Sequence, residues 1–276
     1  MTRYALISDV HGNFVALERN LYDILFVQKI GPSEIRCLGD IVGYYPWANE
    51  CVERLKKLKI PTVKGNHDHA SADPDFDITK FNDIARAAIE FTRSSLTEEH
   101  KEDLSLLPYI YQGDSFQWVH ANPIPPYEDF KYIEETRGNG SVNPTDVFEV
   151  MEGNVLFTAH THQPRIFKED KSDFRSFKII GAGDELYRLE PDRKHIIDIG
   201  SIGQPRDNQS MSCYVIYDDR ENTVQYIRLE YNIRAVQETV MQMDYAKTPL
   251  EKNRKAGDVV CQTVGDYLSQ RLVAGV

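Results

Sequence analysis

The chain has little cysteine, no long hydrophobic run and no excess of basic charge. Its 276 residues include only four cysteines, Cys37, Cys51, Cys213 and Cys261, which form no CxxC pair and are too far apart for a disulfide framework. We interpret them as reduced core residues, with a single functional thiol as the alternative. No window has the length and apolarity of a transmembrane helix, and residues 1–4 lead directly into an apolar strand rather than a signal peptide. We therefore expect a cytoplasmic protein without membrane contact.

The charge balance is acidic. Lys and Arg total 32 against 43 Asp and Glu, which gives a formal net charge of −11. An extended surface for nucleic acid or anionic membrane would need clustered Lys and Arg, so both partners are disfavoured. If the protein acts on phosphates, bound cations must supply the attraction.

Apolar periodicity along the first 110 residues predicts strands that alternate with helices. The predicted strands are 4–7, 35–38 and 61–64, and the predicted helices are 14–26, 47–58, 81–94 and 97–107. The acidic stretch 70–77 is expected to be a loop. This alternation indicates parallel βαβ units, which place their sites at the carboxyl ends of the strands.

The second half is expected to be richer in strands. Strands are predicted at 116–119, 154–158, 174–180, 185–189, 195–199, 213–217 and 224–229. The irregular span 121–144 is expected to be a lid or binding loop. Helices are predicted at 234–243 and 259–272, joined by a polar linker at 247–257. With no internal repeat visible, we expect one domain at 1–230 and a helical extension at 231–276 packed on it.

Polar residues with metal-binding side chains follow the predicted strands. They are Asp9, His11, Asp40, Asn66, His67, His120, His160 and His162. Alone, Asp9-Val10-His11 is better explained by an Asx-turn or a helix cap. Because strand ends meet at one sheet edge, the whole set instead predicts two adjacent divalent ions, bridged by one carboxylate.

These residues stand in five ordered motifs: Asp9-Val10-His11, Gly39-Asp40, Gly65-Asn66-His67-Asp68, His120 and Ala159-His160-Thr161-His162. The pattern resembles the calcineurin-like metallophosphoesterase superfamily over about residues 4–164, with Ala159 where that signature has Gly. The runs 39–46 and 201–207 are similar to those of small bacterial and archaeal single-domain phosphoesterases. The resemblance implies an α/β fold (α+β by some schemes), a four-layer αββα sandwich of two mixed sheets flanked by helices.

The resemblance also implies how the metals are held. Asp9, His11 and His162 would bind one ion, and Asn66, His120 and His160 the other, with Asp40 as the bridge. Such mixed nitrogen and oxygen sites accept Mn, Fe, Zn, Co or Ni, so the ligand types leave the metal open.

The activity that the resemblance implies is hydrolysis of a phosphate ester. The two ions would lower the pKa of a shared water, and the resulting hydroxide would attack phosphorus. His67 would donate a proton to the leaving alkoxide, with Asp68 as the candidate to orient its ring. His69 is expected to be an exposed loop residue.

Residues 43–47 and the span 121–144 are expected to decide the substrate. Protein Ser/Thr phosphatases carry a phosphate-clamping Arg soon after the bridging Asp, where this chain has Gly43-Tyr44-Tyr45. Tyr44 and Tyr45 could stack on a base or aryl group, or could pack the start of the next helix. Arg206 could contact the phosphate or form a structural ion pair.

We therefore expect a hydrolase of small phosphomonoesters or phosphodiesters, nucleotides included. A protein Ser/Thr phosphatase is disfavoured by the missing arginine, and a nuclease by the acidic composition. A protein-binding scaffold of the same fold, as in a retromer subunit that lacks the catalytic histidine, is the non-enzymatic alternative. The presence of His67 and of every metal ligand favours the enzyme. The oligomeric state is left open.

Overall fold

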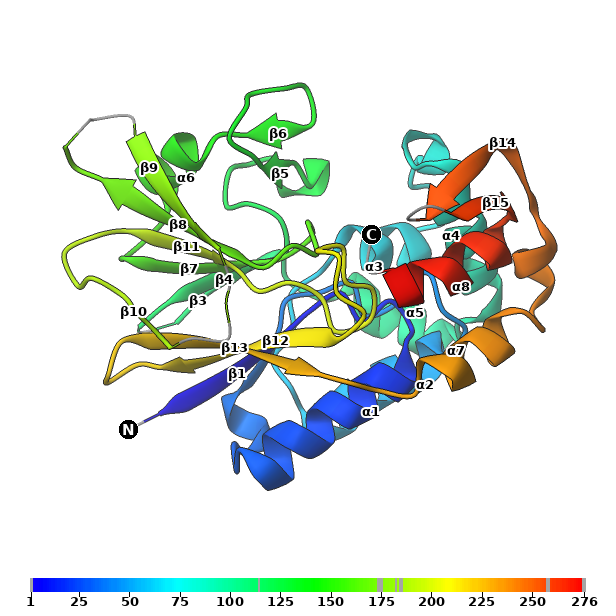
Figure 1. The fold of residues 1–276 in the computed structure, drawn as a ribbon, viewed down its shortest axis with the longest axis horizontal. Helices are drawn as coiled ribbons and strands as arrows, with labels where there is room; N and C mark the ends of the chain where they lie inside the picture. The colour runs from blue at the N-terminus through cyan, green and yellow to red at the C-terminus, as the bar shows by residue number, and fades with distance from the viewer. Residues whose placement is uncertain are drawn as a thin grey trace.

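The first strand, β1 (Arg3–Ile7), shows how the layers are built. Ala5 and Ile7 pack on one face with the helices, whereas Leu6, between them, faces the second sheet. A strand buried on both faces must lie between two apolar layers. The computed structural model, which describes residues 2–113, 115–172, 176–181, 183, 186–256 and 259–274, places β1 inside such a sandwich (Figure 1).

Two mixed sheets form the middle of the sandwich. The first has the order β10-β13-β12-β1-β2, and the second has the order β3-β4-β7-β11-β8-β9. The strands of the first are β1, β2 (Ile35–Cys37), β10 (Tyr187–Arg188), β12 (Ser212–Asp218) and β13 (Thr223–Leu229). Those of the second are β3 (Ile110–Gln112), β4 (Gln117–Val119), β7 (Val155–Thr158), β8 (Arg165–Asp170), β9 (Ser176–Gly181) and β11 (His195–Asp198). Parallel pairs, such as β1 with β2 and β7 with β11, lie beside antiparallel ones in both sheets.

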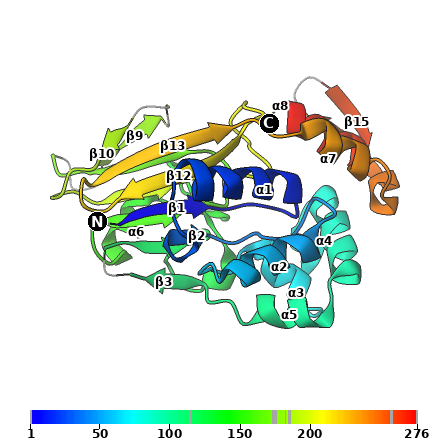
Figure 2. The same ribbon diagram turned by 90° about the horizontal axis from the view of Figure 1, so that it is seen from below.

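Helices cover the outer faces. The α-helices are α1 (Phe14–Tyr22), α2 (Ala48–Leu58), α3 (Asn66–Ala72), α4 (Asp83–Ser95), α5 (Glu98–Ser105), α6 (Pro144–Val150), α7 (Ile233–Val240) and α8 (Val264–Ala274). Helices α1 and α2 pack on the first sheet and α6 packs on the second (Figures 1 and 2). The predicted four-layer αββα sandwich of two mixed sheets is therefore confirmed.

Short elements complete the chain. They are the π-helical turn η1 (Asp23–Val27), the 3₁₀ turns η2 (Pro32–Glu34), η3 (Ile78–Lys80), η4 (Tyr127–Asp129) and η5 (Asp244–Lys247), and the two-stranded pairs β5 (Tyr132–Ile133) with β6 (Ser141–Val142) and β14 (Pro249–Ala256) with β15 (Val259–Thr263). In the described residues, no helix combines the length and apolarity needed to cross a membrane. All four cysteines are buried and free, as predicted.

The structure corrects several predicted elements. The predicted linker 247–257 is largely strand β14, and the predicted helix 259–272 begins only at Val264 because its first residues pair with β14. The predicted loop 70–77 begins with the last turn of α3, and the predicted strand 61–64 makes a single bridge, from Thr62 to Cys37. Strands β3 and β8 and helix α6 were not predicted. The first residues of the predicted strands 174–180 and 185–189 lie outside the described residues.

Candidate metal centre

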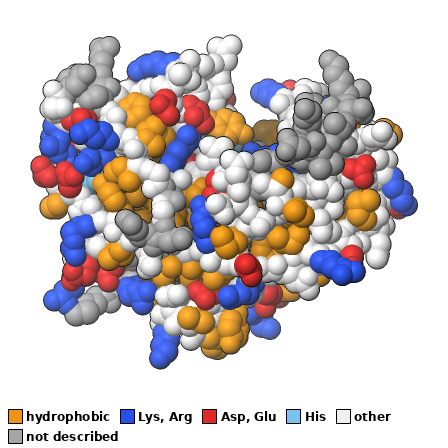
Figure 3. All heavy atoms as spheres, in the orientation of Figure 1, with side chains coloured by type: hydrophobic (Ala, Val, Ile, Leu, Met, Phe, Trp, Pro, Cys, Tyr) orange, Lys and Arg blue, Asp and Glu red, His pale blue; other side chains and the backbone are white. Residues whose placement is uncertain are grey.

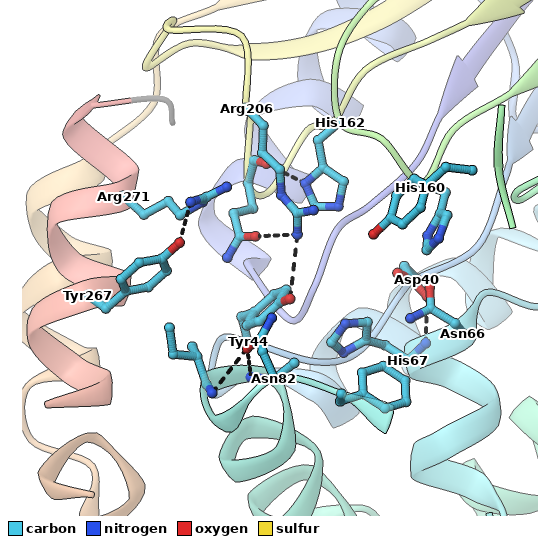
Figure 4. A pocket seen from close by; sticks show the side chains of 15 residues that line it. Asp40, Tyr44, Asn66, His67, Asn82, His160, His162, Arg206, Tyr267 and Arg271 are labelled. Atoms are coloured by element: carbon cyan, nitrogen blue, oxygen red, sulfur yellow. Dashed lines mark hydrogen bonds between the residues drawn. The ribbon is translucent and has the colours of Figure 1, made fainter. Parts of the chain in front are cut away.

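The predicted ligands meet at the carboxyl ends of strands from both sheets. Asp9 and His11 follow β1, Asp40 follows β2, Asn66 opens α3, His120 follows β4, and His160 and His162 follow β7. Each of these seven side chains belongs to a buried residue, no more than 9% exposed. Figure 4 shows Asp40, Asn66 and His160 on one side of a shared pocket and His162 next to Arg206.

The donor atoms are close enough to share cations. Asp9, His11 and His162 offer one set of donor atoms within 4.8 Å of one another, and Asp40, His120 and His160 offer another. The Asp40 carboxylate lies between the sets, because its Oδ2 is 3.7 Å from His11 Nε2 and 3.4 Å from His120 Nε2. Asn66 joins the second set, with its Oδ1 3.2 Å from His120 Nε2.

Hydrogen bonds from the histidine rings to backbone carbonyls determine which ring nitrogens are acceptors in the centre. Backbone carbonyls of Gln204 and Leu38 accept from Nδ1 of His162 and His120, at 2.5 and 2.7 Å. Nδ1 of both rings therefore carries a proton, which leaves Nε2 of the neutral His162 ring as an acceptor. His162 Nε2 nevertheless lies 3.0 Å from His11 Nε2 and 3.2 Å from Asp9 Oδ1. Acceptors packed this closely repel each other unless a cation lies between them, so this donor set fits divalent metals.

The pKa shifts of most of these groups favour the deprotonated forms that bind metals. Burial lowers the pKa of His11, His160 and His162. Burial opposes ionisation of Asp9 and Asp40, but the neighbouring imidazoles outweigh it and lower the pKa of both carboxyl groups.

His120 is the exception among the rings. Burial disfavours its charged form, but the Asp40 carboxylate outweighs burial and raises the pKa of His120 to about 9. A metal must displace that proton in order to bind.

The backbone of the ligands is held in an uncommon conformation. Five of them have left-handed φ angles: Asp9 (51°), His11 (52°), Asp40 (51°), His160 (70°) and His162 (60°). Backbone bonds between adjoining loops maintain it, such as Asp9 N–H to Gly39 O at 3.0 Å and His11 N–H to Asp40 O at 2.9 Å. Strained residues of this kind are typical of functional sites.

The His67 ring lines the pocket, next to the two sets of candidate ligands. Its ring lies between those of His11, Tyr44 and Phe81, with centroids 4.8, 4.7 and 5.5 Å away. Its Nδ1 is buried without a hydrogen-bond partner. Burial, assisted by the charge of Arg206, lowers the pKa of His67 to about 4.

Asp68 does not make the contact predicted for it. Its Oδ1 accepts from the backbone N–H groups of Ile41 and Val42 at 2.8 and 3.2 Å, and its Oδ2 accepts from Gly65 N–H at 3.0 Å. These bonds bind the start of α3 to the loop that follows Asp40. Asp68 therefore supports the backbone of the site, and the predicted bond to the His67 ring is absent from its hydrogen bonds.

The predicted substrate contacts separate into two groups. Tyr44 and Arg206 line the pocket, and Arg206 Nη2 lies 3.5 Å from the Tyr44 hydroxyl. Tyr45 is fully buried in the core cluster formed with α4 and α8, away from the pocket lining.

The pocket has further lining residues, most of which sequence reasoning missed. The cavity, of about 150 Å³, is also lined by Phe81, Asn82, Ile84, Ala85, Tyr132, Gln204, Tyr267 and Arg271. Tyr132, in the predicted binding loop, stacks on His160 with centroids 4.1 Å apart. Tyr267 and Arg271 come from α8, about 60 residues beyond Arg206 in the chain, and no local motif marked them.

Comparison with known proteins agrees with this geometry. Residues 2–227 match the calcineurin-like phosphoesterase family. The chain is 33% identical over 241 residues to an uncharacterized protein of Methanocaldococcus jannaschii, covering 86% of this chain and 91% of that protein. A metallophosphoesterase from Sphaerobacter thermophilus superposes with a TM-score of 0.74 at 29% identity, over 100% of both chains. A hypothetical protein from Pyrococcus horikoshii shares the fold, with a TM-score of 0.67 at 21% identity over 87% of this chain and 93% of that one. The chain belongs to the calcineurin-like phosphoesterase family.

Proposed function

We propose that the protein hydrolyses small phosphomonoesters or phosphodiesters, nucleotides among them, with two divalent metal ions. The close approach of three acceptor atoms, His11 Nε2, His162 Nε2 and Asp9 Oδ1, carries the proposal, because a cation between them would satisfy all three. Family membership supports the phosphate ester as the substrate class.

The proximity of the donor atoms supports the division of ligands. Asp9, His11 and His162 would hold one ion; Asn66, His120 and His160 the other; Asp40 would bridge them. Mn, Fe, Zn, Co or Ni suits this mixture of nitrogen and oxygen donors. Bound divalent ions act as Lewis acids and lower the pKa of water, which supplies a nucleophile near neutral pH.

The remaining side chains act on the substrate. With its pKa lowered to about 4, His67 is neutral near pH 7 and keeps one N–H, which can donate to the leaving oxygen. Arg206 adds positive charge beside the pocket for the nonbridging oxygens. Tyr132 and Phe81 exclude water from the same volume.

Substitution of His67 tests the proposal. In protein loaded with Mn²⁺, His67→Ala should keep its metal and lose about 10²- to 10³-fold in kcat, because the hydrogen bond from its N–H to the leaving oxygen is lost. Hydrolysis of p-nitrophenyl phosphate and its bis ester, with metal content by elemental analysis, is the measurement. His69→Ala is the matched control, because that ring lies on the same helix but outside the pocket lining and contacts Tyr109.

The scaffold alternative has a clear signature. If the metal-loaded wild type cleaves neither ester and His67→Ala changes nothing, the protein is a binding scaffold rather than an enzyme. The cytoplasmic location and the lack of nucleic-acid partners stay predictions.

A further inference from the structure

Two arginines from distant parts of the chain share the wall of the pocket opposite Asn66. Arg206 comes from the turn after β11, and Arg271 comes from the last turns of α8. Figure 4 shows the Arg206 guanidinium above Tyr44 and the Arg271 guanidinium beside Tyr267, on the same side of the pocket. Both residues line the cavity that holds the metal ligands Asp40, His160 and His162.

Neither guanidinium is neutralised by the protein. Arg206 donates to Gln204 Oε1 at 3.0 Å and approaches the Tyr44 hydroxyl, and Arg271 donates to the Tyr267 hydroxyl. All these partners are uncharged. Among the described residues, no carboxylate forms an ion pair with either arginine, and Nε of both is buried without a hydrogen-bond partner.

Arg271 is the less favourably placed of the two groups. Burial and then the charge of Arg206 lower the pKa of Arg271, whereas neighbours that include Tyr44 and Asp9 raise the pKa of Arg206 despite its burial. Each guanidinium has five N–H donors, and the hydrogen bonds above involve only one nitrogen per residue. A charged donor without a partner is costly where it is buried, as Nε of both residues is, so an anion bound by the two groups would offset that cost.

We propose that Arg206 and Arg271 form a second anion subsite, which selects phosphate esters that carry a further phosphoryl group. This inference rests on the proposed function, which places the scissile phosphate at the metals. A phosphoryl group matches the subsite better than a single carboxylate, because it presents more oxygens to the free N–H groups of the two guanidinium groups. Bound metals add positive charge next to the subsite, so a substrate with two anionic groups is favoured further.

Contacts of the C-terminal segment with the rest of the fold hold Arg271 in place. Tyr267 and Arg271 are four residues apart and therefore lie on one face of α8. The Tyr245 hydroxyl donates to the backbone oxygen of Tyr44 at 2.7 Å, which ties the segment to the loop after Asp40. A Cβ on Gly265 would lie 2.7 Å from Cβ of Ala246, so the start of α8 is in close contact with η5. The extension at 231–276 thus contributes a wall of the pocket.

The first experiment compares substrates that differ by one phosphoryl group. Phosphate release from ADP and AMP gives the ratio of their kcat/KM values in metal-loaded protein. We expect this ratio to exceed one in the wild type and to fall roughly 10- to 100-fold in Arg271→Gln, from the loss of charge-assisted bonds. Arg234→Gln is the matched control, since Arg234 is exposed on α7 and pairs with Glu238. An equal ratio for wild type and Arg271→Gln overturns the subsite.

The second experiment needs neither turnover nor metal. Isothermal titration of chelator-treated protein with inorganic pyrophosphate should show one site per chain, weakened at least roughly tenfold in Arg271→Gln but not in Arg234→Gln. Absence of binding to the wild type contradicts the subsite. Failure of the proposed function shows instead as no cleavage of p-nitrophenyl phosphate by the metal-loaded wild type, whatever the titration gives.

Discussion

Asp9, His11 and Asp40, which are candidate metal ligands, all have a strained, left-handed backbone conformation. Each such residue costs on the order of 1–3 kcal/mol, which the surrounding loops must offset. The bonds from Asp9 and His11 to the backbone of Gly39 and Asp40 supply part of that support. The donor atoms are therefore placed before any ligand arrives, as a metal site with short distances requires.

At Gly43 an added side chain would collide with two histidine rings of the site. Its φ is +141°, and a Cβ there would lie 2.8 Å from His67 Nδ1 and 2.9 Å from His11 Nδ1. Gly43→Ala should therefore displace both rings and lower kcat by about 10²-fold, the cost of a 1 Å misplacement. Steady-state kinetics on p-nitrophenyl phosphate measures it. Gly181→Ala, with no atom within 4 Å of the new Cβ, is the control and should behave as wild type.

Asp198 makes stability depend on pH in an unusual direction. Burial outweighs the nearby charge of Arg165 and raises the pKa of Asp198 from 3.8 to about 8. Its Oδ2 accepts from the Thr161 hydroxyl at 2.5 Å, between the ligands His160 and His162. Because the folded state binds the proton more tightly, this group's contribution is fully present below about pH 4 and is lost as pH rises toward 8.

Asp198→Asn should remove this dependence, since its amide remains neutral. In chelator, the free energy of unfolding of the variant minus that of the wild type should increase steadily between pH 5 and pH 8. Denaturant melts at a series of pH values provide the measurement. A difference that stays constant over that range would show that Asp198 is ionised in the folded protein.

The clustering of the candidate metal ligands could be predicted from the sequence because these residues follow apolar runs. Most of the other pocket residues could not. Tyr267 and Arg271 come from a distant helix, and only tertiary packing brings them to the candidate ligands. The hydrogen bonds of Asp68 were not predicted for a similar reason, because adjacency to His67 in sequence does not reveal that its carboxylate turns back to Ile41 and Val42.

At the scale of elements, the regular core was predictable and the C-terminal region was not. Strongly periodic segments such as α2 and α4 were predicted close to their bounds. The run at β15 was mistaken for the start of α8, because a short apolar run fits either structure until its partner strand is known. Strand β8 escaped prediction since Arg165, Lys168 and Glu169 interrupt its apolar residues.

The contact between α8 and η5 gives an element-scale prediction. Gly265→Val should push α8 away from Ala246, because the new side chain has no space there. We expect a loss of about 1–3 kcal/mol in stability, typical of overpacking, and a raised KM for ADP with metal content unchanged. Thermal melts and steady-state kinetics measure these effects.

Val273→Ala is the control for that variant, since Val273 lies on the same helix and is 55% exposed. An unchanged KM in a Gly265→Val protein that is measurably destabilised would show that α8 does not shape the pocket.

Over the whole molecule, the topology of the two sheets explains why a few short motifs are enough to locate the candidate metal centre. Strands β1 and β2 of the first sheet and β4 and β7 of the second end at the same side of the sandwich. The pocket lies between the β5 region and the C-terminal segment, where the surface is hollowed in Figure 3. An acidic chain with a net charge of −11 thus concentrates positive charge, from arginines and any bound metals, where a phosphate would enter.

Metal stoichiometry at the proposed bridge tests the central claim most directly. After dialysis against Mn²⁺, elemental analysis of the wild type should give two ions per chain. Asp40→Asn should hold fewer than one, because a neutral amide bridges two cations poorly. Two ions per chain in Asp40→Asn, or fewer than two in the wild type, would contradict a dinuclear centre bridged by Asp40.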